Sequence, residues 1–373
     1  MMHDVLVIGG GAIGCASALA LAKRGARVRL VERSHPGAEA SSAAAGILGA
    51  YVEAHDTGPF TDLCFRSLAM YAAWTASLFD VTGIDVGQRP SGSMRVFTDR
   101  DALERDTKLM HGAFGDDALP LDPEAARALE PALSTNIVGA LRFRKDCRID
   151  PPALMRAVEG AARAAGVTIT NDDGAARLLL EDGRATGAVL HSGEHARAGS
   201  VVLTAGAWSV LEASGLEAGW IGPIRGQMIE LRMPERPFDH VVFGPGAYLS
   251  PRDDGRIIVG STQERAGFHK AVTVRGVRGL LEGAAAIVPA VEDAEIARTW
   301  SGLRPATPDG LPMIGPGHVP GLVVAAGHFR NGILLSPITG EIVADLIAGK
   351  APCVDLAPFA VERFAGLSPA ARA

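Results

Sequence analysis

Short apolar runs alternate with longer amphipathic stretches along the chain, which is the pattern of an α/β protein. The apolar run at residues 5–8 is followed by an Ala- and Leu-rich stretch at 15–24 and by a stretch at 27–31 in which arginines alternate with apolar residues before Leu30 and Val31. Because no helix breaker interrupts the middle stretch, this order predicts a strand, a helix and a second strand within residues 1–35.

The same patterns predict the elements that follow. Amphipathic spacing predicts a helix over 60–82 and a polar, helical segment over 99–130. Asp150, placed before Pro151 and Pro152, is a suitable N-cap and predicts a helix over 150–165. Strands are predicted at 92–97, 201–209, 227–233, 246–251, 256–261 and 321–327, and further helices at 276–288 and 337–348.

The connection between the first strand and the first helix has the spacing Gly9-x-Gly11-x-x-Gly14. In such a turn the first glycine allows the tight bend, the second lets a phosphate approach the backbone, and the third lets helix and strand pack closely. The helix N-terminus then directs free N–H groups at the anion. Glu32 ends the second strand, where an acid binds the ribose hydroxyls of a dinucleotide.

Composition narrows the class of protein further. A chain of 373 residues with 47% hydrophobic and 21% charged residues is long enough for two globular domains. Its net charge of −6 argues against a nucleic-acid partner, and no apolar run approaches the roughly 20 residues that span a bilayer. Cys15, Cys64, Cys147 and Cys353 lack metal or redox spacing, so we expect no metal site and a reduced, cytoplasmic setting.

Glycine-rich α/β character returns twice after the first unit. We therefore predict a discontinuous dinucleotide-binding domain from residues 1–84, 149–222 and 305–364, with a substrate domain from 85–148 and 223–304. The turn and acid alone suit either NAD or FAD. The late strand, loop and helix favour FAD, because a helix N-terminus near the flavin C2 carbonyl would stabilise the charge of the reduced ring.

Four motifs resemble those of the glycine/D-amino-acid oxidase family of FAD enzymes, and the resemblance covers nearly the whole chain. They lie at 42–50, at 248–252 with 255–262, at 302–305 with 309–310, and at 326–335. The resemblance is strongest to family members that oxidise glycine in thiamine biosynthesis. It implies a Rossmann-like FAD-binding domain with a second, mixed α+β substrate domain, as in D-amino-acid oxidase.

The resemblance also implies a set of FAD contacts. The glycine turn would hold the pyrophosphate, the second strand the adenosine, residues 45–47 the isoalloxazine ring, and residues 328–334 its pyrimidine side. The implied residues are Gly9, Gly11, Ala12, Ile13, Gly14, Glu32, Arg33, Ser41, Ser42, Ala45, Gly46, Ile47, Ala176, His328, Arg330, Asn331, Gly332, Ile333 and Leu334. No cysteine stands near residues 302–304, where some relatives attach the flavin, so the FAD is expected to be noncovalent.

For the substrate, the resemblance implies that Arg304 binds the carboxylate, that Tyr248 is a second donor, and that Arg330 lies at the rim of the flavin. Arginine suits this role because its planar fork meets a carboxylate with two parallel hydrogen bonds. Taken singly, the three residues have plainer readings: Tyr248 as a core residue, Arg304 as a turn cap, and Arg330 as a surface charge.

The implied reaction needs no side-chain acid or base. The substrate amine reacts neutral, hydride passes from Cα to flavin N5, and the imine hydrolyses to an oxo acid (glyoxylate from glycine) and ammonia. Oxygen then becomes hydrogen peroxide. The protein would contribute proximity and orientation, which is worth on the order of 7–11 kcal/mol. In thiamine synthesis the glycine imine would feed the thiazole.

Several points stay open at the level of the sequence. Gly246 and Gln263 replace a histidine and a methionine of the family pocket, so sarcosine and small D-amino acids join glycine as candidate substrates. One alternative is a quinone-linked D-amino-acid or imino-acid dehydrogenase of the same fold, and another is a non-catalytic flavoprotein subunit. A homo-oligomer is expected, with a tetramer as one form.

Overall fold

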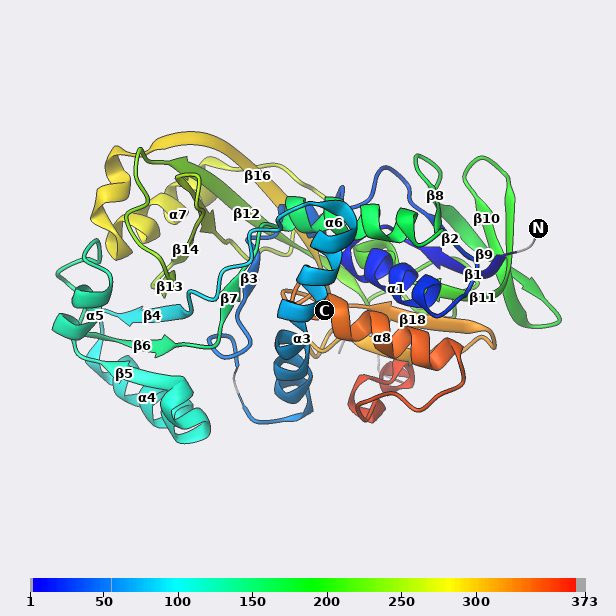
Figure 1. Cartoon of the computed structure of the whole chain (residues 1–373), viewed down its shortest axis with the longest axis horizontal. Helices are drawn as coiled ribbons and strands as arrows, with labels where there is room; N and C mark the ends of the chain where they lie inside the picture. The colour runs from blue at the N-terminus through cyan, green and yellow to red at the C-terminus, as the bar shows by residue number, and fades with distance from the viewer. Residues whose placement is uncertain (1–2, 55, 367–373) are drawn as a thin grey trace.

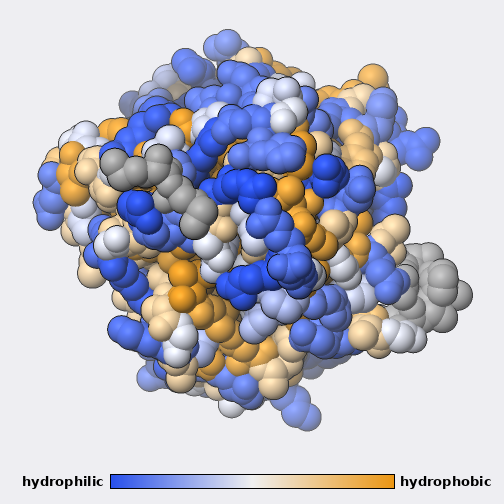
Figure 2. All heavy atoms as spheres, turned by 90° about the vertical axis from the view of Figure 1, so that its right-hand side faces the viewer, coloured by the Kyte–Doolittle hydropathy of each residue, from blue (hydrophilic) through white to orange (hydrophobic). Residues whose placement is uncertain are grey.

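Two sheets of eight strands organise residues 3–54 and 56–366, which are the residues that this computed structural model describes. The sheets occupy opposite halves of an elongated molecule, and several helices lie between and around them (Figure 1). The central helices and the long strands β12 and β16 connect the two halves (Figure 1). Polar and apolar residues are mixed over the face at the first sheet's end (Figure 2).

The first sheet is built around β1, the predicted first strand. β1 pairs in parallel with β2 and β11, which in turn pair in parallel with β8 and β18. β17 closes one edge antiparallel to β18, and β10 and β9 extend antiparallel from β11. The strands are β1 (His3–Ile8), β2 (Val28–Val31), β8 (Thr168–Thr170), β9 (Ala175–Glu181), β10 (Arg184–Leu190), β11 (His195–Leu203), β17 (Met313–Pro316) and β18 (Leu322–Ala326).

A layer of helices packs against this sheet. α1 (Ala12–Lys23) contacts both α6 (Pro151–Ala164) and α8 (Ser336–Ile347), and α3 (Pro59–Thr82) packs on α6 and α8. Nearly all of α1 is buried, as its Ala- and Leu-rich sequence requires. Gly340 lets α8 approach α1 closely, since a Cβ on Gly340 would lie 2.8 Å from the carbonyl oxygen of Ala16 in α1.

The second sheet has the strand order β16-β12-β15-β14-β13-β4-β6-β5. Its longest pair is antiparallel, with Gly222 opposite Ala306 at one end and Arg232 opposite Glu295 at the other. Helix α7 (Val274–Ile287) covers one face of the sheet, and Leu280 and Ala284 contribute to the core between them. The strands are β4 (Ser93–Phe97), β5 (Ala118–Leu121), β6 (Gly139–Phe143), β12 (Gly222–Arg232), β13 (Val241–Gly244), β14 (Ala247–Pro251), β15 (Arg256–Gly260) and β16 (Glu295–Ala306).

A short pair, β3 (Ile47–Leu48) with β7 (Cys147–Arg148), lies between the two sheets. Just before β3, the one-turn helix α2 (Ala40–Ala43) meets β16. That contact requires Gly302, because a Cβ there would lie 2.8 Å from the Cβ of Ala43. The small-residue segment at 40–50 therefore runs from the first sheet to the second.

Most predicted elements are present. The helix predicted over 60–82 is α3, and the helix predicted over 150–165 is α6, whose N-cap Asp150 accepts a hydrogen bond from the Ala153 N–H. The strands predicted at 92–97, 246–251 and 256–261 are β4, β14 and β15. Cys15, Cys64 and Cys147 are buried free thiols, whereas Cys353 is exposed.

The expectation that residues 99–130 are helical was wrong in the middle of that segment. α4 (Arg100–Phe114) and α5 (Pro123–Leu129) are separated by β5, which pairs with β6 at the edge of the second sheet. An edge strand tolerates Pro120, and its pairing partner lies outside the segment, so local pattern could not reveal it. The hairpin β9–β10 was likewise not predicted.

The strands of each sheet follow the residue ranges predicted for the two domains, apart from the ends of β12 and β16, which cross residues 222 and 304. The domain boundaries themselves stay a prediction. Within residues 3–54 and 56–366, the structure contains no helix that combines the length and apolarity needed to cross a bilayer.

Candidate functional site

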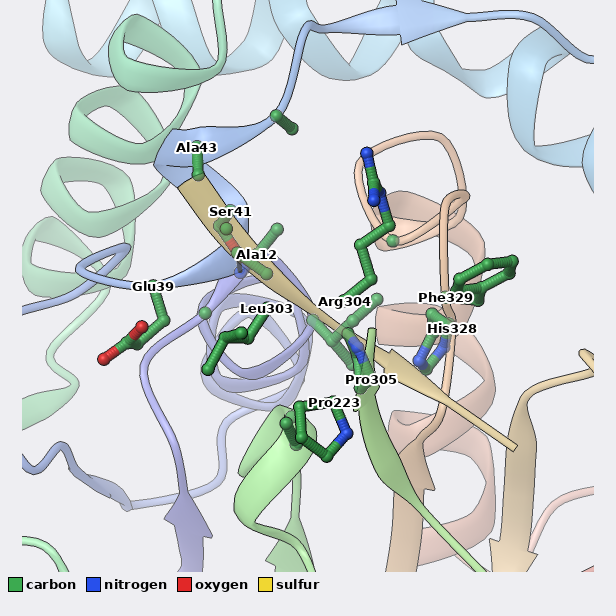
Figure 3. A pocket seen from close by; sticks show the side chains of 18 of the residues that line it. Ala12, Glu39, Ser41, Ala43, Pro223, Leu303, Arg304, Pro305, His328 and Phe329 are labelled. Atoms are coloured by element: carbon green, nitrogen blue, oxygen red, sulfur yellow. Dashed lines mark hydrogen bonds between the residues drawn. The ribbon is translucent and has the colours of Figure 1, made fainter. Parts of the chain in front are cut away.

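A cavity of about 1220 Å³ extends from the carboxyl ends of the parallel strands in the first sheet to the face of the second sheet. Ile8, Val31, Thr204 and Ala326, at or just beyond the ends of β1, β2, β11 and β18, all line it. This crevice is where open α/β sheets bind their ligands. Ala12 and Ser41 lie on one side of the close view, and Arg304, His328 and Phe329 on the other (Figure 3).

The glycine turn forms a cradle that side chains would fill. Gly9 has φ +103°, and a Cβ there would lie 2.7 Å from the Thr204 carbonyl oxygen. A Cβ on Gly14 would lie 1.9 Å from the carbonyl oxygen of Gly9. Gly11 faces the cavity, where an added Cβ would meet only the Ser41 hydroxyl within 4 Å, at 3.2 Å. The turn therefore fits the close approach of a phosphate.

Polar side chains complete this end of the cavity. The Glu32 carboxylate accepts hydrogen bonds from the N–H groups of Gly10 (2.7 Å) and Ser34 (2.9 Å). The Ser41 hydroxyl accepts one from the Ala12 N–H at 2.9 Å. The N–H that we expected to meet the pyrophosphate directly is thus bonded to Ser41, whose own hydroxyl hydrogen remains available to an anion.

Next to Glu32, two aromatic rings that sequence reasoning did not single out line the cavity. The Arg33 guanidinium lies 4.1 Å from the ring centroid of Trp208, and the Trp208 and Phe268 rings are 5.2 Å apart. Glu39 binds Arg33 (3.1 Å) and Lys270 (2.8 Å). Ala176 lines the cavity as well. A flat apolar group with polar edges, such as adenine, suits these surroundings.

The stretch at residues 45–47 lines the middle of the cavity. Gly46 has φ +72°, and a Cβ there would lie 2.0 Å from the Ile149 carbonyl oxygen, so only glycine fits. The Ala45 carbonyl accepts a hydrogen bond from Arg252, a buried arginine that sequence reasoning also missed. Burial lowers the pKa of Arg252 to about 10, which still leaves it charged at neutral pH.

Arg304 and Tyr248 both line the cavity at its second-sheet end. The Arg304 guanidinium donates to the Ser261 hydroxyl (2.6 Å) and the Thr262 carbonyl (3.2 Å), and it forms no ion pair within the described residues. It lies so close to β12 that a Cβ on Gly226 would be 2.1 Å from its Nη1. Burial raises the pKa of the Tyr248 hydroxyl, and nearby Arg304 opposes this.

His328 and Arg330 follow β18. His328 is buried with Nε2 3.2 Å from the Thr339 hydroxyl, and burial lowers the pKa of its imidazole to about 3. Because the imidazole has so low a pKa and its Nε2 is hydrogen-bonded to Thr339, His328 is better suited to a structural role beside the cofactor than to the role of general base. Arg330 lies at the exposed rim, where it pairs with Glu53 at 3.6 Å. Glu53 belongs to no recognised motif and was missed.

Most of the predicted site residues line the cavity together, and four do not. Gly14 packs against Gly9, and Ser42 lies against Gly37. The Asn331 backbone closes a turn between His328 and Leu335, and the Leu334 carbonyl accepts a hydrogen bond from Ser67. Within the described residues no group of His, Cys, Asp or Glu is arranged to bind a metal ion.

Comparisons with known proteins agree with this geometry. Residues 4–346 match the family model described as FAD dependent oxidoreductase. A glycine oxidase of Geobacillus kaustophilus is 37% identical over 98% of each chain, and its crystal structure superposes with a TM-score of 0.92, covering 98% of this chain and 100% of that one. The crystal structure of an iminodiacetate oxidase from Chelativorans is 28% identical with a TM-score of 0.88, covering 96% of this chain and 98% of that one.

A further relative is a bifunctional protein ThiO/ThiG from Nostoc, 37% identical over 93% of this chain. The chain spans about half the length of that relative, 53%.

The cavity and its glycine cradle thus occur in a chain that belongs to the FAD-dependent oxidoreductase family, with FAD as cofactor. Within that family the chain is similar to the glycine oxidases, which confirms the resemblance predicted from the four motifs. The predicted fold class is confirmed as well. The assignments of individual residues to FAD and to substrate stay predictions.

Proposed function

We propose that this chain catalyses the FAD-dependent oxidation of glycine. The observation that carries the proposal is the cation Arg304, which has no ion-pair partner among the described residues and lies near Tyr248 in the cavity that also contains residues 45–47. A carboxylate is the anion that an arginine fork binds best. Glu53, an acid that also lines this part of the described cavity, is paired with Arg330.

The chain's contribution is to bind and aim a small amino acid. Arg304 donates to the substrate carboxylate while Ser261 and Thr262 hold the guanidinium. Tyr248 stays protonated at neutral pH, since burial raises its pKa, and it supplies a second donor. FAD, when bound, supplies the hydride acceptor. Orientation in such a site is worth on the order of 7–11 kcal/mol.

Among the described residues, no side chain in the substrate half of the cavity is placed to act as a strong base. His328 is neutral and bonded to Thr339, and Glu53 is paired with Arg330. The substrate amine therefore has to enter the reaction already neutral. Since an amine loses its proton more readily as pH rises, the rate with glycine should increase with pH.

The broader role is also a proposal. The similarity to a glycine oxidase and to a bifunctional ThiO/ThiG protein supports a supply of glycine imine for the thiazole of thiamine. Sarcosine and small D-amino acids remain candidate substrates, because Gly246 is exposed and Gln263 also lines the cavity. Oxygen as acceptor, a homo-oligomeric state and a cytoplasmic location stay predictions.

A steady-state assay tests the function. FAD-loaded protein is mixed with glycine, sarcosine or D-alanine in air, and oxygen uptake, peroxide and the oxo acid are measured. We expect glyoxylate and peroxide in equal amounts from glycine. Rapid turnover with a quinone but slow oxygen uptake would replace the oxidase by a dehydrogenase, and no turnover with any acceptor would reject the proposal.

A further inference from the structure

Glu53 is an acidic side chain of the substrate half of the cavity. Three acids line the described cavity, and two belong to its adenosine end. Glu32 is bonded to backbone N–H groups there, and Glu39 is paired with Arg33 and Lys270. Glu53 instead lies 3.6 Å from Arg330, and its side chain is 18% exposed.

The turn that carries Glu53 is fixed from several sides. Directly after β3, the N–H groups of Tyr51 and Val52 donate to the two carboxylate oxygens of buried Asp146, at 2.9 and 3.0 Å. Arg95 donates to the Val52 carbonyl. A backbone held in this way gives Glu53 a defined place in the cavity wall, unlike a surface carboxylate on a mobile loop.

The charges around the substrate position are therefore two cations and one anion. Within the part of the chain that the structure describes, Arg304 forms no ion pair, whereas Arg330 is paired with Glu53. All three act on the Tyr248 hydroxyl: Glu53 raises its pKa, and Arg304 and Arg330 lower it. One net positive charge remains, which matches a substrate with one carboxylate.

The cavity wall near Gly246 leaves room for a substrate larger than glycine. Gly246 is exposed, and a Cβ added there would find its nearest neighbour at 3.6 Å. Gln263, which also lines the cavity, is neutral. Discrimination against a longer acidic substrate would accordingly depend on charge more than on size.

We propose that Glu53 restricts this site to monocarboxylic amines, by occupying Arg330 and repelling a second anionic group on the substrate's nitrogen or side chain. The inference rests on the proposed oxidation of glycine. It names Glu53 as a specificity-determining residue, and it concerns the charge of the substrate.

The test compares glycine with iminodiacetate, which is glycine carrying a second carboxymethyl group on nitrogen. In Glu53→Gln we expect the ratio of kcat/KM for iminodiacetate to that for glycine to rise on the order of tenfold, since one like charge is removed and Arg330 is freed. Glu53→Asp keeps the charge and should keep the low ratio. Glu39→Gln, an acid of the same cavity at its adenosine end, should also leave the ratio unchanged.

A binding measurement separates this inference from the proposed function. Acetate and malonate are titrated into the FAD-loaded protein, and the flavin absorbance reports their dissociation constants. Glu53→Gln should lower the dissociation constant of malonate relative to that of acetate. If this happens but no amine is oxidised, only the proposed function fails. The role of Glu53 would be overturned if the ratio of the malonate and acetate dissociation constants did not change. It would also be overturned if Glu53→Gln lowered turnover of glycine and of iminodiacetate by the same factor.

Discussion

The two ends of the cavity are built in different ways. At the adenosine end, backbone atoms of the glycine turn form part of the wall, and a side chain at Gly9 or Gly14 would collide with other backbone. At the substrate end, the wall consists of side chains, chiefly Tyr248, Arg304 and Glu53, held on separate elements. The glycine positions of the turn should therefore tolerate almost no substitution, whereas the second end can change its substrate while keeping its cofactor.

The largest expected effect is at the backbone-built end. In Gly14→Ala the added Cβ would lie 1.9 Å from the Gly9 carbonyl oxygen, so we expect a protein that no longer retains FAD, measured by flavin content after purification. Gly112→Ala is the matched control, because Gly112 is an exposed helical glycine with nothing within 4 Å. Gly112→Ala should stabilise the folded protein by about 0.5–1 kcal/mol. Full FAD content in Gly14→Ala would contradict the difference between the two ends.

Removing Arg304 should affect the other end alone. Arg304→Ala is expected to weaken substrate binding by about 3 kcal/mol, because the carboxylate loses its charged partner, while FAD content stays normal. KM for glycine and flavin content are the two measurements. Arg298→Ala, in the same strand but paired with Glu230, is the control. An unchanged KM in Arg304→Ala would remove this residue from the substrate site.

Acid should destabilise the protein through His328, which lines the cavity after β18. Burial lowers the pKa of His328 from 6.5 to about 3, so between these values the unfolded chain binds more protons than the folded one. This contribution to stability is complete above about pH 6.5 and decreases as pH falls toward 3. From pH 7 to pH 5 it amounts to about 2 kcal/mol.

Urea unfolding at pH 7 and pH 5, for wild type and His328→Asn, checks this value. Comparing the two proteins isolates His328 from other titrating groups, such as Asp146, whose pKa burial raises to about 7. Identical pH dependence in both proteins would mean that the imidazole is not kept neutral by burial.

The smallest expected effect distinguishes two adjacent serines. Ser41 lines the cavity and accepts the Ala12 N–H, whereas Ser42 does not line it. Ser41→Ala should weaken FAD binding by about 1 kcal/mol, the usual net contribution of one hydrogen bond, and Ser42→Ala should have almost no effect. Fluorescence titration of the apoproteins with FAD measures both. Equal losses would show that the two hydroxyls act alike.

The sequence predicted the backbone-built end well, because its signal is local. The strand, the glycine spacing, the helix and Glu32 all lie within one short stretch, and each follows from periodicity or backbone geometry. Likewise α3 and α6 were predicted from their own spacing and caps. In contrast, β5 depends on pairing with β6, which no local pattern reveals.

The substrate end was predicted only where a family motif covered it. Tyr248 and Arg304 lie in such motifs, but Glu53 faces Arg330 because Asp146, far along the chain, fixes its turn. Gly226 is a similar case, since its need to be glycine arises from Arg304 on the neighbouring strand. The placement of Glu53 and the requirement for glycine at position 226 arise from tertiary contacts, which leave no local pattern in the sequence.

The most direct test of the account is a single turnover without oxygen. FAD-loaded wild type and Arg304→Ala are mixed anaerobically with the same concentration of glycine, and the flavin absorbance is followed. The account predicts that wild type bleaches and yields one glyoxylate per flavin, while Arg304→Ala keeps its FAD and bleaches roughly a hundredfold more slowly at the same subsaturating glycine concentration. A wild type that stays yellow with glycine, sarcosine and D-alanine, or equal bleaching in both proteins, would contradict it.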